Sequence, residues 1–161
     1  KYILIYNVRS MAYSGRFKPN TPSKYMGDPT NIVYRSLWEL KLMMYLDRHT
    51  KVLRWGSEEI IIPYRSPIDG RVHRYFPDFF VEQINKNGKK ESILIEVKPK
   101  YQTVPPDLKK KNTTTGRISR KYLNEVKTWG VNSAKWAAAE GYCKDRGWKW
   151  QIMHEDHLGI K

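Results

Sequence analysis

The sequence predicts a mixed α/β fold with the element order αβββαβ, in which a mixed central sheet is flanked by helices. A helical pattern comes first, over residues 31–48, where apolar side chains recur at three-to-four spacing. Three strand-like stretches rich in Val, Ile and Phe follow, at residues 51–64, 72–84 and 91–98. The last part predicts helices between residues 119 and 144, then a strand over residues 148–153.

Length and composition fit one globular domain. The 161 residues are enough for a sizeable core, and 40% hydrophobic and 13% aromatic residues exclude a disordered chain. We expect residues 31–161 to form this domain. Residues 1–30 are interpreted as a basic arm with little regular structure, which either lies along a phosphate backbone or is solvated. We interpret residues 1–10 as vector-derived or as an upstream extension, with an added edge strand as the alternative.

Charge is the strongest signal in the composition. The 30 Lys and Arg against 16 Asp and Glu give a formal net charge of +14, which favours a polyanionic partner, above all nucleic acid. No apolar stretch approaches the roughly 18 residues that span a bilayer, so no membrane partner is expected. The single cysteine, Cys143, excludes an internal disulfide and is consistent with a reducing cytoplasm.

The helix over residues 31–48 carries the first candidate site residue. Ser36 followed by Glu39 has the spacing of a capping box, in which two side chains satisfy free backbone N–H groups of the first turn. Glu39 therefore has two interpretations. It either only secures the start of the helix, or it points from this turn toward a functional site in the sheet.

The second strand-like stretch, residues 72–84, contains a proline. Asp69 and Gly70 mark the tip of the turn that leads into it. Pro77 cannot donate to a sheet ladder, so the strand bends or stops pairing there. A bend beside Asp78 opens space for a metal ion.

The next turn brings charged residues together. Asn87 and Gly88 indicate a hairpin between two apolar runs, with Asp78 at the start of the first run. Glu96 and Lys98 lie at the end of the second run and share one face because side chains alternate along a strand. We therefore expect two carboxylates and one ammonium to converge at a sheet edge, an arrangement that suits Mg²⁺. The alternative is an ordinary hairpin with charged strand ends.

The chain becomes strongly basic after this hairpin. Its first part reads as a loop, and no acidic residue lies between Lys109 and Lys121. We interpret the segment as a phosphate clamp, with a mobile solvated loop as the alternative. Its cations are Lys109, Lys110, Lys111, Arg117, Arg120 and Lys121.

Two helices are expected after the basic segment. The first, over residues 119–129, stops at Gly130, and Asn132 caps a second helix that runs to residue 144. Gly147 occupies a C-cap position before the final strand. No internal repeat and no mark of a second domain is found in the sequence.

These motifs resemble the PD-(D/E)xK nucleases, whose restriction-endonuclease-like core has the same αβββαβ order. Here Pro77-Asp78 corresponds to the PD half, and Glu96-Val97-Lys98 corresponds to the ExK half. The chain is also similar to TnsA-type transposon endonucleases, which carry glutamine where Glu96 stands. It most resembles the head-completion nucleases of T-even-type phages, through the stretches Met11-Ala12-Tyr13-Ser14-Gly15-Arg16-Phe17, Tyr34-Arg35-Ser36-Leu37-Trp38-Glu39-Leu40-Lys41, His73-Arg74-Tyr75-Phe76-Pro77-Asp78-Phe79 and Ile95-Glu96-Val97-Lys98-Pro99-Lys100.

The resemblance implies hydrolysis of DNA phosphodiesters with Mg²⁺, or Mn²⁺ in its place. The implied catalytic set is Glu39, Asp78, Glu96 and Lys98. The metal would be held by Asp78 and Glu96, with help from Glu39 and the carbonyl of Val97. Lys98 would orient the attacking water or stabilise charge on the phosphate. Arg74 and Lys100 would be further phosphate contacts.

The resemblance also implies a biological setting. It is phage head completion, in which packaged DNA ends are processed before the tail attaches. The expected partners are DNA and phage portal or neck proteins, with a homodimer as a further expectation. The protein would act in the host-cell cytoplasm during assembly and could remain in the virion. The alternatives are a non-cleaving neck or DNA-end-binding protein with a nuclease fold, and a TnsA-like transposition endonuclease.

Overall fold

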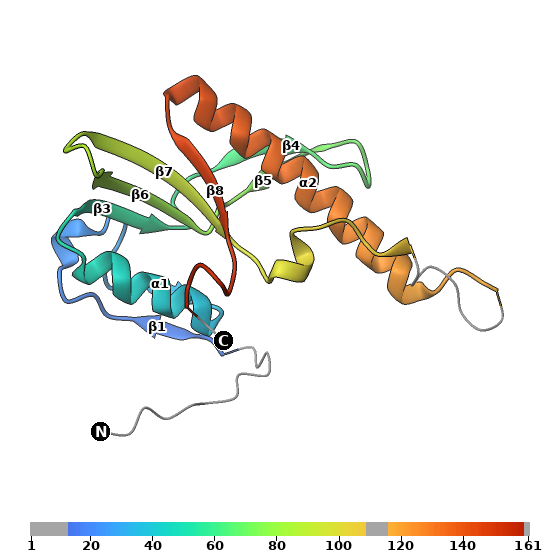
Figure 1. The fold of residues 1–161 in the computed structure, drawn as a ribbon, viewed down its shortest axis with the longest axis horizontal. Helices are drawn as coiled ribbons and strands as arrows, with labels where there is room; N and C mark the ends of the chain where they lie inside the picture. Colours follow the sequence, from blue (N-terminus) through green and yellow to red (C-terminus); the bar gives the residue numbers. More distant parts are fainter. Residues whose placement is uncertain (1–12, 109–115, 160–161) are drawn as a thin grey trace.

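The computed structural model of this chain describes residues 13–108 and 116–159. Its centre is a mixed four-stranded sheet in the order β3-β6-β7-β8 (Figure 1). β6 pairs antiparallel with β3 and with β7, and β8 pairs parallel with β7. The elements of this core are α1 (Leu37–Arg48), β3 (Val52–Ser57), β6 (Phe79–Ile84), β7 (Lys90–Val97), α2 (Arg120–Arg146) and β8 (Lys149–Met153).

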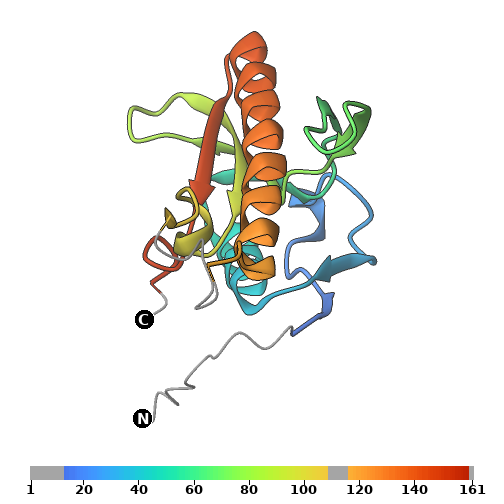
Figure 2. The same cartoon turned by 90° about the vertical axis from the view of Figure 1, so that its right-hand side faces the viewer.

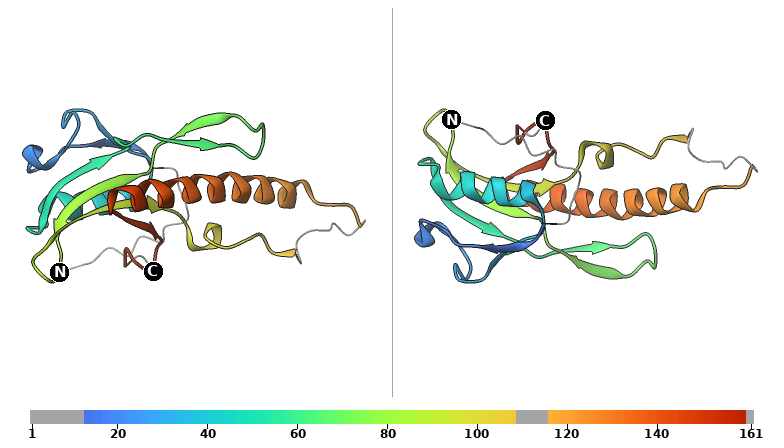
Figure 3. Two further views of the ribbon diagram at one scale, coloured as in Figure 1. Left: turned by 90° about the horizontal axis from the view of Figure 1, so that it is seen from above. Right: turned by 90° about the horizontal axis from the view of Figure 1, so that it is seen from below.

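One helix covers each face of the sheet. Alternate residues of a strand point to opposite faces, so β6 and β7 contribute to two cores. Phe79 and Ile95 pack in the core that includes α1. Phe80 and Leu94 pack in the core that includes Ala139 of α2. Figure 3 shows the two helices on opposite sides of the sheet, with α2 toward the viewer from above and α1 toward the viewer from below.

The core has the predicted order αβββαβ, with one insertion between β3 and β6. The insertion is an antiparallel hairpin of β4 (Ile62–Arg65) and β5 (Val72–Tyr75), which forms a sheet of its own. It stands apart from the main sheet, beside α2 (Figure 2). Lys135 of α2 holds it there, because its ammonium lies 5.7 Å from the ring centroid of Tyr64 and 5.5 Å from that of Tyr75.

The prediction of a single strand over residues 51–64 was wrong. β3 ends at Ser57, and β4 begins at Ile62 in a different sheet. Between them Glu58 has a φ of 57°, a left-handed conformation that residues other than glycine rarely adopt. This conformation turns the chain out of the main sheet. Glutamate is not a turn residue, so the sequence pattern, which suggested only a bulge or bend at Gly56, did not indicate that the strand ends before Glu58.

The helix predicted for residues 31–48 begins later than expected. Ser36 is its N-cap and Leu37 is its first residue. The residues before the cap form β2 (Ile32–Tyr34), which pairs antiparallel with β1 (Gly15–Phe17). The alternating burial of β2 is typical of a strand with one face toward the core.

The segment before α1 is held against the body of the protein. A short 3-10 helix, η1 (Pro22–Lys24), lies between β1 and β2. The carboxylate of Asp47, fully buried on α1, accepts hydrogen bonds from the backbone N–H groups of Asn20 at 2.7 Å and Thr21 at 3.0 Å. The described part of the arm thus has more fixed structure than the sequence predicted. Residues 1–12 lie outside the described part of the chain.

One continuous helix replaces the two that were predicted after residue 119. Ser119 caps its start by accepting a hydrogen bond from the Tyr122 N–H at 3.1 Å, and Gly147, with a φ of 65°, ends it as predicted. Gly130 does not stop the helix, and Asn132 is not a cap but a buried residue in its interior. Neither α2 nor another described helix is long and apolar enough to cross a membrane.

Candidate active site

The start of β6 and the end of β7 bring the predicted carboxylates together. Phe79 of β6 lies opposite Ile95 of β7. Asp78 and Glu96 come directly before the first and directly after the second, so both lie at the same end of the strand pair. The Oδ2 atom of Asp78 accepts a hydrogen bond from the Val97 backbone N–H at 2.7 Å. The proximity predicted from the hairpin is thus confirmed.

Glu96 is a buried carboxylate with two partners. Its side chain is only 4% exposed. One oxygen, Oε1, lies 2.9 Å from the Lys98 ammonium nitrogen. The other, Oε2, accepts a hydrogen bond of 2.6 Å from the hydroxyl of Tyr75, which is itself buried on β5. These contacts hold Glu96 in one orientation, since a buried charge is stable only when it is paired and hydrogen-bonded.

Burial and like charge perturb the titration of this cluster. Burial, and secondarily the Glu96 carboxylate, raises the pKa of Asp78 to about 8. Burial lowers the pKa of Lys98, but Glu96 and Asp78 outweigh it and leave that pKa raised. Burial and Glu96 also raise the pKa of Tyr75, so its hydroxyl stays a hydrogen-bond donor. Two carboxylates confined together in this way favour a bound cation.

The structure shows the capping role of Glu39 directly. Its backbone N–H donates to Ser36 Oγ at 3.1 Å. Its carboxylate accepts from Ser36 Oγ at 2.8 Å and from the Arg35 backbone N–H at 2.8 Å. The N-cap role predicted for Ser36 is confirmed, and the return contact of the Glu39 carboxylate goes to the Arg35 N–H and the Ser36 hydroxyl instead of the Ser36 N–H. Glu39 also contributes to the raised pKa of Asp78, although it is the smallest of the causes.

The residues at the strand ends fit a divalent metal ion. Asp78 and Glu96 supply hard oxygen ligands, and within the described residues Asp78 Oδ1 accepts no hydrogen bond. A cation would also offset the burial, and secondarily the like charge of Glu96, that raise the pKa of Asp78. In residues 13–108 and 116–159 no three His, Cys, Asp or Glu side chains are grouped to hold a metal ion, so Glu39 does not complete a three-carboxylate cluster.

Three neighbouring residues were missed by sequence reasoning. One is Tyr75, the hydrogen-bond donor to Glu96. The others are Arg35 and Glu58, whose side chains form an ion pair. The Glu58 backbone N–H also donates to the Asp78 carbonyl oxygen at 3.2 Å. The pKa of Arg35 is raised mainly by Glu58 and to a lesser degree by Glu39 and Asp78, so its guanidinium lies close to the acidic cluster. The left-handed φ of Glu58 is the kind of local strain that is common at functional sites.

The predicted DNA-contacting residues lie on different elements of the structure. Arg74 is exposed on β5, and its guanidinium lies 5.8 Å from the centroid of the Phe76 ring. Lys100 is in the 3-10 helix η2 (Lys100–Gln102), and its ammonium forms an ion pair of 2.7 Å with Asp156. Arg117, Arg120 and Lys121 are exposed at or just before the start of α2. Lys109, Lys110 and Lys111 lie outside the described residues.

Comparisons with known proteins agree with this geometry. The family described as TnsA-like endonuclease N terminal matches residues 49–155, a range that includes Asp78, Glu96 and Lys98 and begins after Glu39. The chain is 41% identical over 148 residues to the head completion nuclease of Enterobacteria phage T4, an alignment that covers 92% of this chain and 95% of that protein. The chain therefore belongs to the family of TnsA-like endonucleases and is a homologue of a phage head completion nuclease.

Proposed function

We propose that this protein is a Mg²⁺-dependent DNA endonuclease that processes packaged DNA ends during phage head completion. The observation that carries the chemistry is the contact of Lys98 with Glu96 beside Asp78, at the end of one strand pair. The identity to a head completion nuclease supports the setting. Mn²⁺ is expected to replace Mg²⁺ because both accept oxygen ligands.

Each residue of the cluster has a distinct proposed role. Asp78 and Glu96 would hold the ion, with the Val97 carbonyl as a further oxygen donor; Glu39 would join them only by leaving its contacts with Ser36 and Arg35. When bound, the ion acidifies water and neutralises charge on the phosphate. Lys98 keeps its proton, because its pKa is raised, and it donates a hydrogen bond to the attacking water or to a phosphate oxygen. Tyr75 and the Val97 N–H hold the two carboxylates in place.

The basic surface supports DNA as the substrate. A net charge of +14 attracts a polyanion at long range and is expected to make binding strongly salt-dependent. Arg74, Lys100 and the cations at the start of α2 are the proposed phosphate contacts. Portal or neck proteins, in the host-cell cytoplasm and then in the virion, are the proposed assembly partners, and a homodimer is proposed for cutting both strands.

A DNA cleavage assay tests the proposed activity. Linear and nicked-circular DNA are incubated with the protein in Mg²⁺, Mn²⁺ or EDTA, next to the variants Asp78→Ala and Glu82→Ala. Glu82 lies on β6, four residues after Asp78, but forms ion pairs with Arg54 and Lys90, so it is a matched control. Cutting should require the metal and Asp78 but not Glu82. Cutting by Asp78→Ala in Mg²⁺, or by the wild type in EDTA, would refute the proposal.

The match to TnsA-like endonucleases favours a second setting for the same chemistry, DNA cleavage in transposition. Purified phage heads distinguish the two. A head completion nuclease should associate with filled heads. It should also restore tail attachment to heads from which the nuclease is missing. A transposition endonuclease should do neither. DNA binding without cleavage in any metal would instead support a non-cleaving DNA-end-binding protein.

A further inference from the structure

Asn132 is a buried polar residue without a structural partner. It lies in the interior of α2 and is only 9% exposed. Within the described part of the chain its side-chain amide makes no hydrogen bond. The atoms of this amide are not among the buried polar atoms without a partner in the described residues, which belong to Trp55, Trp136 and His154. The amide therefore keeps access to solvent, and it can hydrogen-bond to a ligand at this position.

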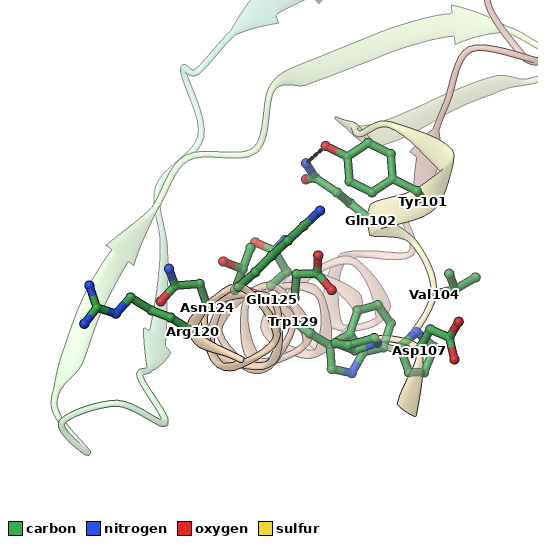
Figure 4. A pocket seen from close by; sticks show the side chains of 13 residues that line it. Tyr101, Gln102, Val104, Asp107, Arg120, Asn124, Glu125 and Trp129 are labelled. Carbon is green, nitrogen blue, oxygen red and sulfur yellow. Dashed lines mark hydrogen bonds between the residues drawn. The ribbon is translucent and has the colours of Figure 1, made fainter. Parts of the chain in front are cut away.

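Asn132 lines a cavity of about 920 Å³ between α2 and the loop after β7. This volume is within the range of about 300–1,000 Å³ that is typical of ligand sites. Figure 4 shows Tyr101 and Gln102 on one wall of the cavity. Trp129 extends from α2 on the side of the loop that carries Val104 and Asp107.

The lining combines aromatic rings with amides. Tyr101 is 73% exposed, and its hydroxyl accepts a hydrogen bond of 2.9 Å from Gln102. Trp129 is braced edge-on against Trp136, with ring centroids 5.7 Å apart. Aromatic rings of this kind stack on nucleobases, and an asparagine amide pairs with base edges. The cavity therefore offers both a stacking surface and a hydrogen-bonding group for a base.

The charged residues that line the cavity favour a base inside it and phosphate groups at its rim. Glu125 lines it and repels phosphate, but a carboxylate accepts hydrogen bonds from the amino group of a base. Arg120 and Lys121 belong to the same lining and are exposed at the start of α2, where they can neutralise the adjoining backbone. A nucleotide satisfies this pattern with its base inside and its phosphates at the rim.

The cavity adjoins the proposed catalytic cluster along the chain. Its wall begins at Tyr101, which follows Lys98 after only Pro99 and Lys100. The backbone N–H of Lys98 is fixed by a hydrogen bond of 2.9 Å to the Met153 carbonyl, so the loop leaves the sheet from an anchored point. A nucleotide in the cavity would thus belong to the same DNA molecule that reaches Lys98.

We propose that this cavity binds an unpaired nucleobase of the DNA substrate, at a frayed or overhanging end. The base is unpaired because a stacked, paired base exposes neither its face nor its pairing edge. This inference rests on the proposed nuclease function and assigns its substrate as DNA with a single-stranded end. Asn132 and Tyr101 are the base-contacting residues.

Fluorescence anisotropy in EDTA tests this assignment without cleavage. The probes are two labelled duplexes of equal paired length, one blunt and one with a short single-stranded overhang. The wild type should bind the overhang duplex more tightly. Asn132→Leu and Tyr101→Leu should each weaken that binding about 10-fold and leave blunt-duplex binding unchanged. The matched controls are Ser133→Ala, next to Asn132 but outside the cavity lining, and Tyr45→Leu, an exposed tyrosine on α1.

Thermal unfolding separates a ligand-binding role from a structural one. Asn132→Leu should leave the melting temperature close to that of the wild type while the overhang preference is lost, because the amide makes no hydrogen bond within the described part of the chain that the change would break. Equal binding of both duplexes by the wild type, or an unchanged preference for the overhang duplex in both cavity variants, would overturn the inference. A protein segment would then be the better occupant of the cavity.

Cleavage of the same duplexes in Mg²⁺ distinguishes this inference from the proposed nuclease function. A protein that cleaves DNA but has no preference for the overhang duplex would refute only the inference about the cavity.

Discussion

The substitution Tyr75→Phe removes a single oxygen atom from the candidate site. That hydroxyl donates a 2.6 Å hydrogen bond to Glu96 Oε2, and both side chains are buried. Glu96 then keeps Lys98, at 2.9 Å, as its remaining side-chain partner. We expect the carboxylate to lose its fixed orientation, because one of its oxygens is left buried without a donor.

Two magnitudes follow from this contact. A hydrogen bond to a charged group contributes about 1.5–3 kcal/mol, so the free energy of unfolding should fall by that amount. For a chain of this size the melting temperature should drop by about 3–12 °C. Residues that orient metal ligands typically change metal affinity or activity by about 10–100-fold, so cleavage at limiting Mg²⁺ should fall in that range.

Metal titrations of the cleavage rate measure the second effect. Tyr64→Phe is the control, because Tyr64 packs edge-on against Tyr75 but its hydroxyl makes no hydrogen bond among the described residues. Tyr75→Phe should move the Mg²⁺ midpoint to higher concentration, and high Mg²⁺ should restore part of the rate. An unchanged midpoint with a lowered melting temperature would show that Tyr75 only supports the fold and would refute this reasoning.

Four further predictions follow from contacts described above. The pKa of Asp78 is raised to about 8 in the folded protein, above the value of about 4 of an unfolded aspartate. Without metal the folded state therefore binds more protons between these two pH values, and the free energy of unfolding should decrease from pH 4 to pH 8. Chemical denaturation across this pH range measures the decrease, and Asp78→Asn should make it smaller. Metal binding below pH 8 should release a proton, which calorimetry in buffers of different ionisation enthalpy detects. Glu39→Gln should keep the capping box and the melting temperature but lower the cleavage rate, whereas an unchanged rate would make Glu39 a cap alone. Asp47→Ala should lower the free energy of unfolding by about 3 kcal/mol, since it leaves the backbone N–H groups of Asn20 and Thr21 without their acceptor, and DNA cleavage at low temperature should stay near the wild-type rate.

The core of the fold was predictable because its signals are local. Hydrophobic periodicity and the Asn87-Gly88 turn specify β6 and β7, and the Ser36–Glu39 capping box specifies the start of α1. The errors arose where tertiary packing overrides local preference. α2 continues through Gly130, near Pro67 of the hairpin loop, where an added Cβ would make only an ordinary van der Waals contact of 3.7 Å with the proline ring.

The candidate site was predictable only as far as strand pairing determines it. Asp78, Glu96 and Lys98 follow from hairpin register and side-chain alternation. Tyr75 lies in an inserted hairpin, and its contact with Glu96 depends on how that hairpin is placed against the sheet. Glu58 depends on a backbone angle that no residue pattern indicates. Neither could be found without the three-dimensional structure.

Calorimetric titration of Mn²⁺ into the metal-free protein tests the central claim, that Asp78 and Glu96 form a metal centre, without reference to any substrate. The account predicts one saturable site that is lost in both Asp78→Asn and Glu96→Gln and retained in Glu82→Gln, whose carboxylate pairs with Arg54 and Lys90 away from the cluster. Equal Mn²⁺ affinity in the wild type and in both cluster variants would contradict it.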